Sequence, residues 1–363
     1  MKKFLLNAGV QKIFAALLAI LFGLVFGIVI LFIASFFISK ASYPMDALYT
    51  IVTGGLRFSG LKGLGIIMRF MSPILLTGLS VGFAFKTGLF NIGASGQFVI
   101  GGFVAAYICI KWTFIPLEYL WIVGILGAVI AGGLVGLISG LLKAYRNVNE
   151  VISAIMLNYI AMITVSNLVS VIADKNNPSR TMPPLSRIPT LGLDKIFGNN
   201  TTDISIFIAI LVAILIYIIL ERTTFGYELK ACGYNRNAAR YAGINDRLGI
   251  TLSMTIAGAL AGLGGAMVYI SSITKVFDSL LTLAPEGFDG ISVALLGMSN
   301  PLGIIFSAAF IAALKNAGPA LSRSGFNEEV VKIMTAVIIY ASAFSLIFRE
   351  KLVQFFTKKG AKK

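Results

Sequence analysis

The sequence predicts an all-α protein, a polytopic bundle of transmembrane helices, and three observations predict it. Of the 363 residues, 57% are hydrophobic and only 12% are charged, whereas a soluble domain carries about 25% charged residues. The charges are segregated, so that long apolar stretches lie between them, as in a chain that folds within lipid. No segment between these stretches approaches the roughly 100 residues of a separate globular domain. We therefore expect one membrane-spanning domain over residues 1–363.

The apolar runs predict about ten spans, within a range of about eight to ten, because one helical crossing needs about 20 apolar residues. Residues 280–317 are interrupted by Pro285, Asn300-Pro301 and Gly318-Pro319, so we expect two short or discontinuous helices there. Arg69 lies near one end of the second run, and we expect it to snorkel to the interface. The clear runs are Ile13–Ser39, Leu64–Phe85, Phe90–Ile110, Tyr119–Leu142, Val151–Ile172, Ile204–Leu220, Leu248–Thr274 and the shorter Ile333–Phe348.

The basic residues predict the orientation. With an even number of spans, the four main basic segments fall on one side, which the positive-inside rule identifies as the cytoplasm. Both chain ends are therefore expected in the cytoplasm of a cell-membrane protein. These segments are the amino end with Lys2, Lys3 and Lys12, the pair Lys143 and Arg146, the loop 221–247, and the tail 349–363.

Two segments are expected on the opposite side. Residues 174–203 hold four prolines and nearly balanced charges, so we expect an irregular extracytoplasmic loop. Residues 40–62 carry basic residues against the positive-inside rule. A short helix over Asp46–Gly55 that lies on or dips into the membrane would account for them.

Composition excludes several classes of function. The net charge of +15 is not gathered into a basic helix or an aromatic-interleaved patch, so no nucleic-acid partner is expected. The chain has no histidine, which removes histidine zinc sites, general bases and proton relays. Cys109 and Cys232 are too isolated for a disulfide framework or a metal knuckle. Without a convergent catalytic set or any Gly-Lys dipeptide for a phosphate loop, we expect no enzyme, metal or cofactor.

Polar residues inside the runs are the candidate functional residues. Asn91 and Gln97 lie beside two glycines in an otherwise uncharged stretch, and amides in lipid must form hydrogen bonds or line an aqueous cavity. The glycines permit a broken helix there. Asn149 is suited to cap the next helix, but Asn158 lies two turns deeper and needs another explanation. Both readings of the amides, interhelical hydrogen bonding and pathway lining, stay open.

Three acidic residues and several glycines give weaker signals. Asp278, Glu286 and Asp289 flank the irregular region, where carboxylates serve ion coupling or simply contact solvent. Glycines spaced four apart predict close approach of helix backbones. These glycines are Gly78 and Gly82, Gly132, Gly136 and Gly140, and Gly258 and Gly262.

The basic loop 221–247 contains a short stretch of good helix formers. Arg236 and Arg240 are four residues apart within Arg236–Tyr241, which Gly233 and Gly243 bound. Such a helix offers a docking surface for a soluble partner, or it is a positive-inside loop without one.

This loop resembles the cytoplasmic coupling segment of ABC importer permeases of the branched-chain amino acid, ribose and nucleoside class. Phe90–Gln97 resembles that family's Asn-Ile-Gly-x-x-Gly-Gln stretch. Asn149–Ile152 and Met156–Ala161 resemble the subgroup that works with lipoprotein receptors for nucleosides. The resemblance spans roughly Gly78 to Gly303. Relatives often carry an acidic residue at the position of Ser95, so a carboxylate role cannot be transferred there.

The resemblance implies an ATP-driven importer in which this permease pairs with itself or with a second permease. Separate cytoplasmic ATPases hydrolyse ATP, and an extracytoplasmic lipoprotein delivers the solute. Nucleosides are the expected cargo, with sugars and riboflavin-like molecules as alternatives, and an ion-driven secondary carrier is the rival class. The basic tail is expected to rest on anionic membrane lipid.

The resemblance also assigns roles to two sets of residues. The expected solute pathway comprises Phe90, Asn91, Gln97, Asn149, Asn158 and Tyr159. The expected ATPase-coupling set comprises Gly233, Asn235, Arg236, Ala239, Arg240 and Gly243.

Overall fold

The computed structural model describes residues 8–37, 43–172, 184–198, 201–271, 282–322, 325–326 and 329–343. Within these ranges every regular element is a helix and none is a strand, which confirms the all-α prediction. The basic residues Lys2 and Lys3, residues 174–183 of the predicted loop, Asp278 and the tail 349–363 lie outside the described residues.

Eight helices among the described residues are long and apolar enough to cross a membrane, a number within the predicted range. They are α2 (Ala8–Phe37), α4 (Leu56–Lys86), α5 (Ala94–Lys111), α6 (Leu117–Arg146), α7 (Glu150–Ile172), α9 (Ser205–Arg222), α12 (Asp246–Tyr269) and α14 (Pro301–Ser322). The shorter elements are α3 (Pro44–Val52), η1 (Pro184–Ser186), α8 (Leu193–Phe197), α10 (Thr224–Tyr234), α11 (Arg236–Tyr241), α13 (Pro285–Leu296) and α15 (Glu329–Ala343).

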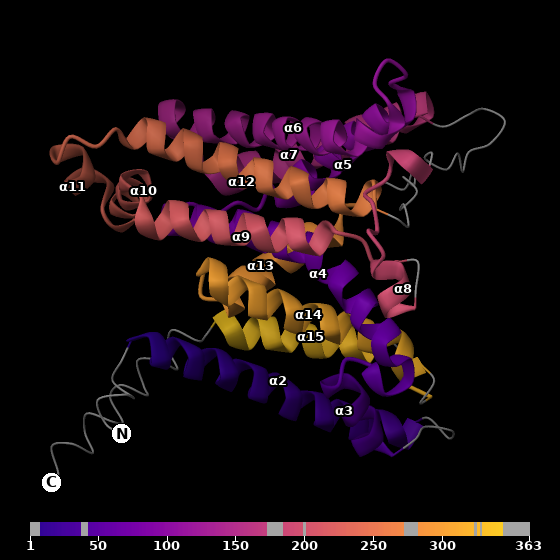
Figure 1. Cartoon of the computed structure of the whole chain (residues 1–363). Helices are drawn as coiled ribbons and strands as arrows, with labels where there is room; N and C mark the ends of the chain where they lie inside the picture. The colour runs from indigo at the N-terminus through magenta and orange to yellow at the C-terminus, as the bar shows by residue number, and fades with distance from the viewer. Residues whose placement is uncertain are drawn as a thin grey trace, which may run out of the picture.

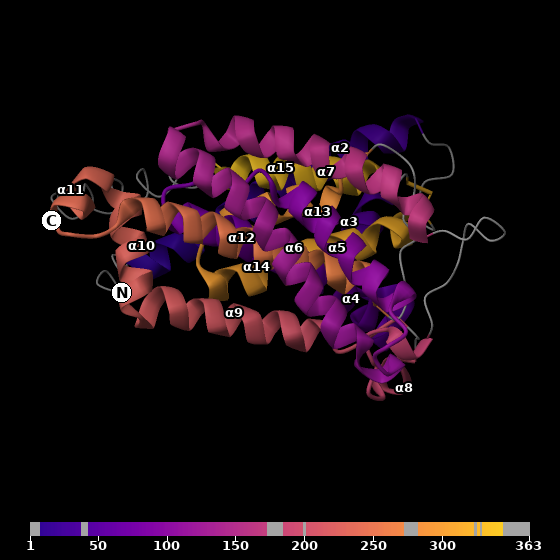
Figure 2. The same cartoon turned by 90° about the horizontal axis from the view of Figure 1, so that it is seen from above.

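The long helices run roughly along one common direction (Figure 1). The helices α10 and α11 project at one end of the bundle, and α3 and α8 lie at the opposite end, as the second view also shows (Figure 2). Helix α4 is central, because it packs against α12, α13, α14 and α9. The bundle therefore has two distinct ends and an interior organised around α4.

Helix α6 packs along α12 through the glycines that the sequence singled out. A Cβ atom added at Gly136 would lie 2.2 Å from the carbonyl oxygen of Met254, and one at Gly132 would lie 2.4 Å from that of Gly258. Only a residue without a side chain permits this backbone approach. The predicted close packing is confirmed for this pair of helices.

The irregular region predicted over residues 280–317 is two helices. Helix α13 has 12 residues and α14 has 22, and residues 297–300 form the turn between them. Each helix begins with proline, whose fixed φ suits the first helical position. Helix α3 also corresponds to the short helix predicted over Asp46–Gly55.

Two predicted span boundaries differ from the structure. Helix α4 is assigned from Leu56, but a kink at Gly60, whose φ of +50° and ψ of −133° are not helical, divides it, and the uninterrupted helix begins after that kink, a few residues before the predicted Leu64. Arg69 lies more than two turns after the kink. Helix α5 begins at Ala94 rather than at Phe90, since the segment before it bonds through side chains instead of forming a helical turn.

Gly136→Ala should destabilise the protein, whereas Gly133→Ala on the same helix should not. The nearest atom to a Cβ at Gly133 is 3.6 Å away, an ordinary contact, and alanine favours helix there. Overpacking at Gly136 should cost about 1–3 kcal/mol. Thermal unfolding of both variants in detergent measures the difference. Equal midpoints for the two variants would show that the α6–α12 contact does not limit stability.

Candidate functional site

Helix α5 begins inside the bundle, and a side chain from α7 satisfies the backbone at its start. The carboxamide oxygen of Asn158 accepts a hydrogen bond from the Gly96 backbone N–H at 2.8 Å. The carboxamide nitrogen of the same residue donates to the Ile92 carbonyl at 3.0 Å. The first N–H groups of a helix lack partners within the helix, so Asn158 acts as a cap supplied by another helix.

Close packing makes this cap possible. A Cβ atom added at Gly96 would lie 2.8 Å from the Asn158 Cα atom. A larger residue at position 96 would push α7 away and stretch both hydrogen bonds. The glycine of the predicted motif thus determines how near α7 comes to the start of α5.

Asn91 and Gln97 form a reciprocal amide pair in the interior. The Asn91 amide nitrogen donates to the Gln97 side-chain oxygen at 2.8 Å and to the Ser80 hydroxyl at 2.9 Å. The Gln97 amide donates back to the Asn91 oxygen at 3.2 Å. Both side chains are almost fully buried. Interhelical and local hydrogen bonding therefore accounts for these polar atoms, and direct contact with a solute stays a prediction.

The start of α5 meets the start of α13. The Ser95 hydroxyl donates to the Ala284 carbonyl at 2.9 Å, and a Cβ atom added at Gly287 would lie 2.5 Å from the Ser95 backbone. Thr77 of α4 donates to the Glu286 carbonyl at 2.9 Å. We name this contact of two interrupted helices the α5–α13 junction. Two helix N-termini, each with a positive dipole end, thus approach one another inside the protein.

The remaining predicted pathway residues lie apart from the amides. Asn149 is exposed and caps α7, accepting from the Val151 N–H at 2.9 Å. Phe90 stacks on Phe85 with ring centroids 5.0 Å apart. Tyr159 is exposed on α7, whereas the adjacent Asn158 is buried. The structure therefore brings Asn91, Gln97 and Asn158 around the start of α5, but it does not bring Asn149 or Tyr159 there.

Sequence reasoning missed the hydroxyl groups that complete this network. Ser80 supports Asn91, Thr77 supports α13, and Ser95 supports the junction. Thr77 and Ser80 are polar residues inside one apolar run, and such residues signal hydrogen bonds between helices. The sequence therefore indicated that these hydroxyls form hydrogen bonds, but not with which residues.

The coupling segment, residues 223–246, is built around one acidic side chain. Asp246 accepts from the Arg236 Nε at 2.5 Å and from the Arg240 guanidinium at 2.8 and 3.2 Å. Asn235 caps α11 by accepting from the Ala238 N–H at 3.0 Å. The hydrogen bond and the charge of Asp246 raise the pKa of Arg240. Both arginines thus form ion pairs with Asp246, the first residue of α12, and these pairs fix the position of α11.

The other predicted coupling residues serve the same segment. Gly233 lies against the backbone of residues 86–88, where an added Cβ would lie 2.6 Å from the Lys86 carbonyl oxygen. Ala239 is buried, and Gly243 has φ of +83°, a left-handed conformation that favours glycine. Asn235 and Arg240 are exposed, and the most exposed aromatic side chains are Tyr234 at 91% and Tyr241 at 95%.

The described residues hold no group of three or more His, Cys, Asp or Glu side chains that could bind a metal ion. Residues near the α5–α13 junction are amides and hydroxyls, which suit recognition of uncharged polar groups more than metal coordination.

Comparison with known proteins gives a consistent result. Residues 63–343 match the family described as branched-chain amino acid transport system / permease component. The chain is 34% identical to the nucleoside ABC transporter permease protein NupB of Lactococcus lactis, over 96% of this chain and 95% of that protein. It is 33% identical to the guanosine ABC transporter permease protein NupP of Bacillus subtilis, over 95% and 97%.

A more distant relative is the probable riboflavin import permease protein RfuC of Treponema pallidum, 25% identical over 65% of this chain and 62% of that protein. The family match covers most of the chain, and the first two relatives align over nearly all of it. Together with the eight candidate spans, these similarities identify a multi-pass membrane protein. The chain belongs to the branched-chain amino acid transport system / permease component family.

Proposed function

We propose that this chain is the membrane-spanning permease of an ATP-driven importer for nucleosides. The observation that carries the proposal is the near full-length similarity to two permeases that are named for nucleosides and guanosine. Interrupted helices that meet within the bundle support it, because transporters place their solute sites at such helix breaks. A separate ATPase subunit supplies the energy.

The proposal assigns one task to each end of the bundle. The end with α10 and α11 faces the cytoplasm and binds the ATPase, since two ion pairs hold α11 on α12 and the two short helices present the exposed Tyr234 and Tyr241. The end with α3 and α8 faces outward and receives the solute from an extracytoplasmic lipoprotein. Both chain ends lie in the cytoplasm in this orientation.

The proposal divides the predicted pathway residues by their surroundings. Asn91, Gln97 and Asn158 hold the wall of the route, because their polar atoms already bond to the protein. Phe90 borders the same segment and is the proposed aromatic contact for a base. Tyr159 and Asn149 are exposed, so they meet a solute only if the route runs between this chain and a second permease.

Reconstitution tests the function. The chain and the proteins that co-purify with it are placed in vesicles, and nucleoside uptake is measured with and without ATP on the nucleotide-binding side. Uptake that requires ATP and a co-purified ATPase supports the proposal. Uptake by this chain alone that collapses with an ion gradient would instead identify a secondary carrier.

Asn158→Leu should lower transport more than it lowers the amount of protein in the membrane. The change leaves the Gly96 N–H and the Ile92 carbonyl without their partner, at about 1–3 kcal/mol for each group, so the start of α5 loses its geometry. Met156→Leu, at an exposed position two residues away on the same helix, is the control. Nucleoside uptake at matched expression is the measurement. Unchanged uptake in Asn158→Leu would remove this cap from the mechanism.

Tyr241→Cys should react with a polar maleimide in the permease alone and be protected in the complete complex. Both native cysteines are buried, and burial raises the pKa of Cys232 with further help from Asp246 and Glu228, so the background reaction is slow. Tyr119→Cys, at the opposite end, should be labelled equally in both states. Mass spectrometry counts the labels, and equal labelling of Tyr241→Cys in both states would place the ATPase elsewhere.

A further inference from the structure

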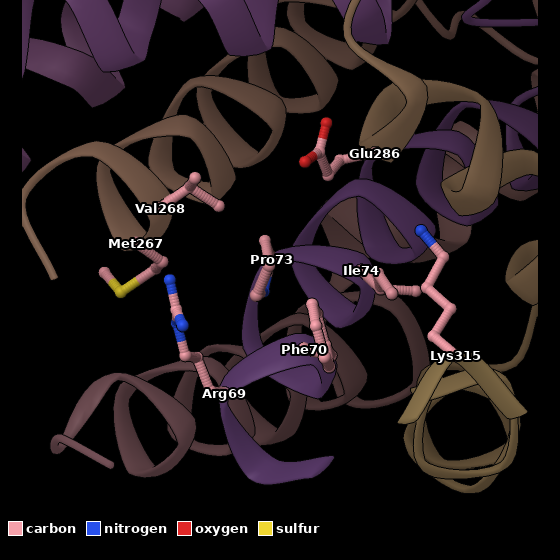
Figure 3. A pocket seen from close by; sticks show the side chains of 8 residues that line it. All are labelled: Arg69, Phe70, Pro73, Ile74, Met267, Val268, Glu286 and Lys315. Atoms are coloured by element: carbon pink, nitrogen blue, oxygen red, sulfur yellow. The ribbon is translucent and has the colours of Figure 1, made fainter. Parts of the chain in front are cut away.

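A cavity of about 250 Å³ lies between α4, α12, α13 and α14 (Figure 3). Its volume has room for about eight waters, or for one small solute. Pro73 and Ile74 line it one turn beyond Thr77 on α4, and Met267 and Val268 line it near the last residues of α12. It therefore lies on the side of the α5–α13 junction that faces away from the coupling segment.

The wall of this cavity has an apolar part and a charged part. Phe70, Pro73 and Met267 contribute to the apolar part. Arg69 extends from α4 and Glu286 from the first turn of α13, and both side chains enter the same space (Figure 3). Apolar walls with a few convergent polar groups are typical of small-molecule sites.

Charges of both signs border the cavity. Lys315 of α14 lines it and forms an ion pair with Asp289 of α13, and the charge of Asp203 acts on Arg69. Glu286 is favoured by its place at a helix N-terminus. Ionisable residues within spans are costly, and they mark solute or ion pathways. Three of them, Arg69, Glu286 and Lys315, line this cavity, and Asp289 compensates Lys315 from behind the wall.

We propose that this cavity is a station on the transport route that holds an uncharged solute with a planar ring and hydroxyl groups. The inference rests on the proposed function and names its binding site. The Glu286 carboxylate accepts hydrogen bonds from two neighbouring hydroxyls. The Arg69 guanidinium donates to oxygen or nitrogen atoms on the ring edge, and the apolar wall contacts the ring faces.

The balance of charge predicts a selectivity. A nucleoside presents a ring and a diol without net charge, so it leaves the ion pair of Lys315 with Asp289 intact. A nucleotide adds a phosphate whose negative charge must lie beside Glu286 or compete with Asp289 for Lys315. The station should therefore accept nucleosides and reject nucleotides.

The test uses the complete transporter, with its ATPase and receptor, in proteoliposomes. Guanosine uptake and ATP hydrolysis are measured together for wild type, Glu286→Gln and the matched control Glu118→Gln, which changes an exposed acid at the outer end of α6. Loss of a hydrogen bond to a charged group should lower uptake per ATP hydrolysed by about tenfold or more in Glu286→Gln. The control should equal wild type.

Photolabelling of the wild-type complex with 8-azidoguanosine tests the site without any variant. Label within residues 66–78, 262–269, 282–296 or 311–319 supports the station, and label confined to other peptides overturns it. Unchanged uptake per ATP in a folded Glu286→Gln variant also overturns it. A third result also overturns it: wild-type uptake that depends on a proton gradient, together with Glu286→Gln uptake that does not, since Glu286 would then serve ion coupling. Absence of ATP-driven uptake in wild type would refute the proposed function, whereas photolabelling still decides on the cavity.

Discussion

The structure depends on one constraint: backbone groups at a helix break inside a membrane must find partners within the protein. Helix α5 starts in the interior, where the side-chain carboxamide of Asn158 accepts from the Gly96 N–H and donates to the Ile92 carbonyl. Because a carboxamide is short, α7 must lie directly against the start of α5. The position of α7 follows from this bond, and so does the path of residues 87–93.

The same constraint explains how the two interrupted helices come together. The Ser95 and Thr77 hydroxyls each donate a hydrogen bond to a carbonyl oxygen at the start of α13. Gly287 permits the contact, since any side chain there would meet Ser95. The junction thus lies between the coupling segment and the charged cavity.

Much of the fold could be predicted from the sequence, because a run of apolar residues by itself indicates a helix that is surrounded by lipid or protein. The runs of apolar residues gave the long helices, and the prolines at 285 and 301 gave the break between α13 and α14. The glycines of α6 and α12 predicted their close approach. The kink at Gly60 within α4 was not predicted, and the sequence did not indicate that Arg69 lines a cavity.

The candidate site could be predicted only in part. The sequence singled out Asn91, Gln97 and Asn158, but their partners are set by which helices pack together, and sequence spacing does not contain that information. Arg240 was expected to meet the ATPase, and the sequence did not indicate that it pairs with Asp246; its side chain is still 58% exposed, so this contact stays a prediction. Lys315 went unnoticed because a lone lysine in a span gives no sign of its partner on another helix.

The central claim is that the protein itself satisfies the backbone at the start of α5. Hydrogen–deuterium exchange of the peptide covering residues 88–98, followed by mass spectrometry on the full chain in lipid nanodiscs, tests it most directly. The account predicts slow exchange of this peptide in wild type and faster exchange when Asn158 is replaced by leucine. Fast exchange in wild type, unchanged by the replacement, would show that water rather than Asn158 satisfies these groups and would contradict the account.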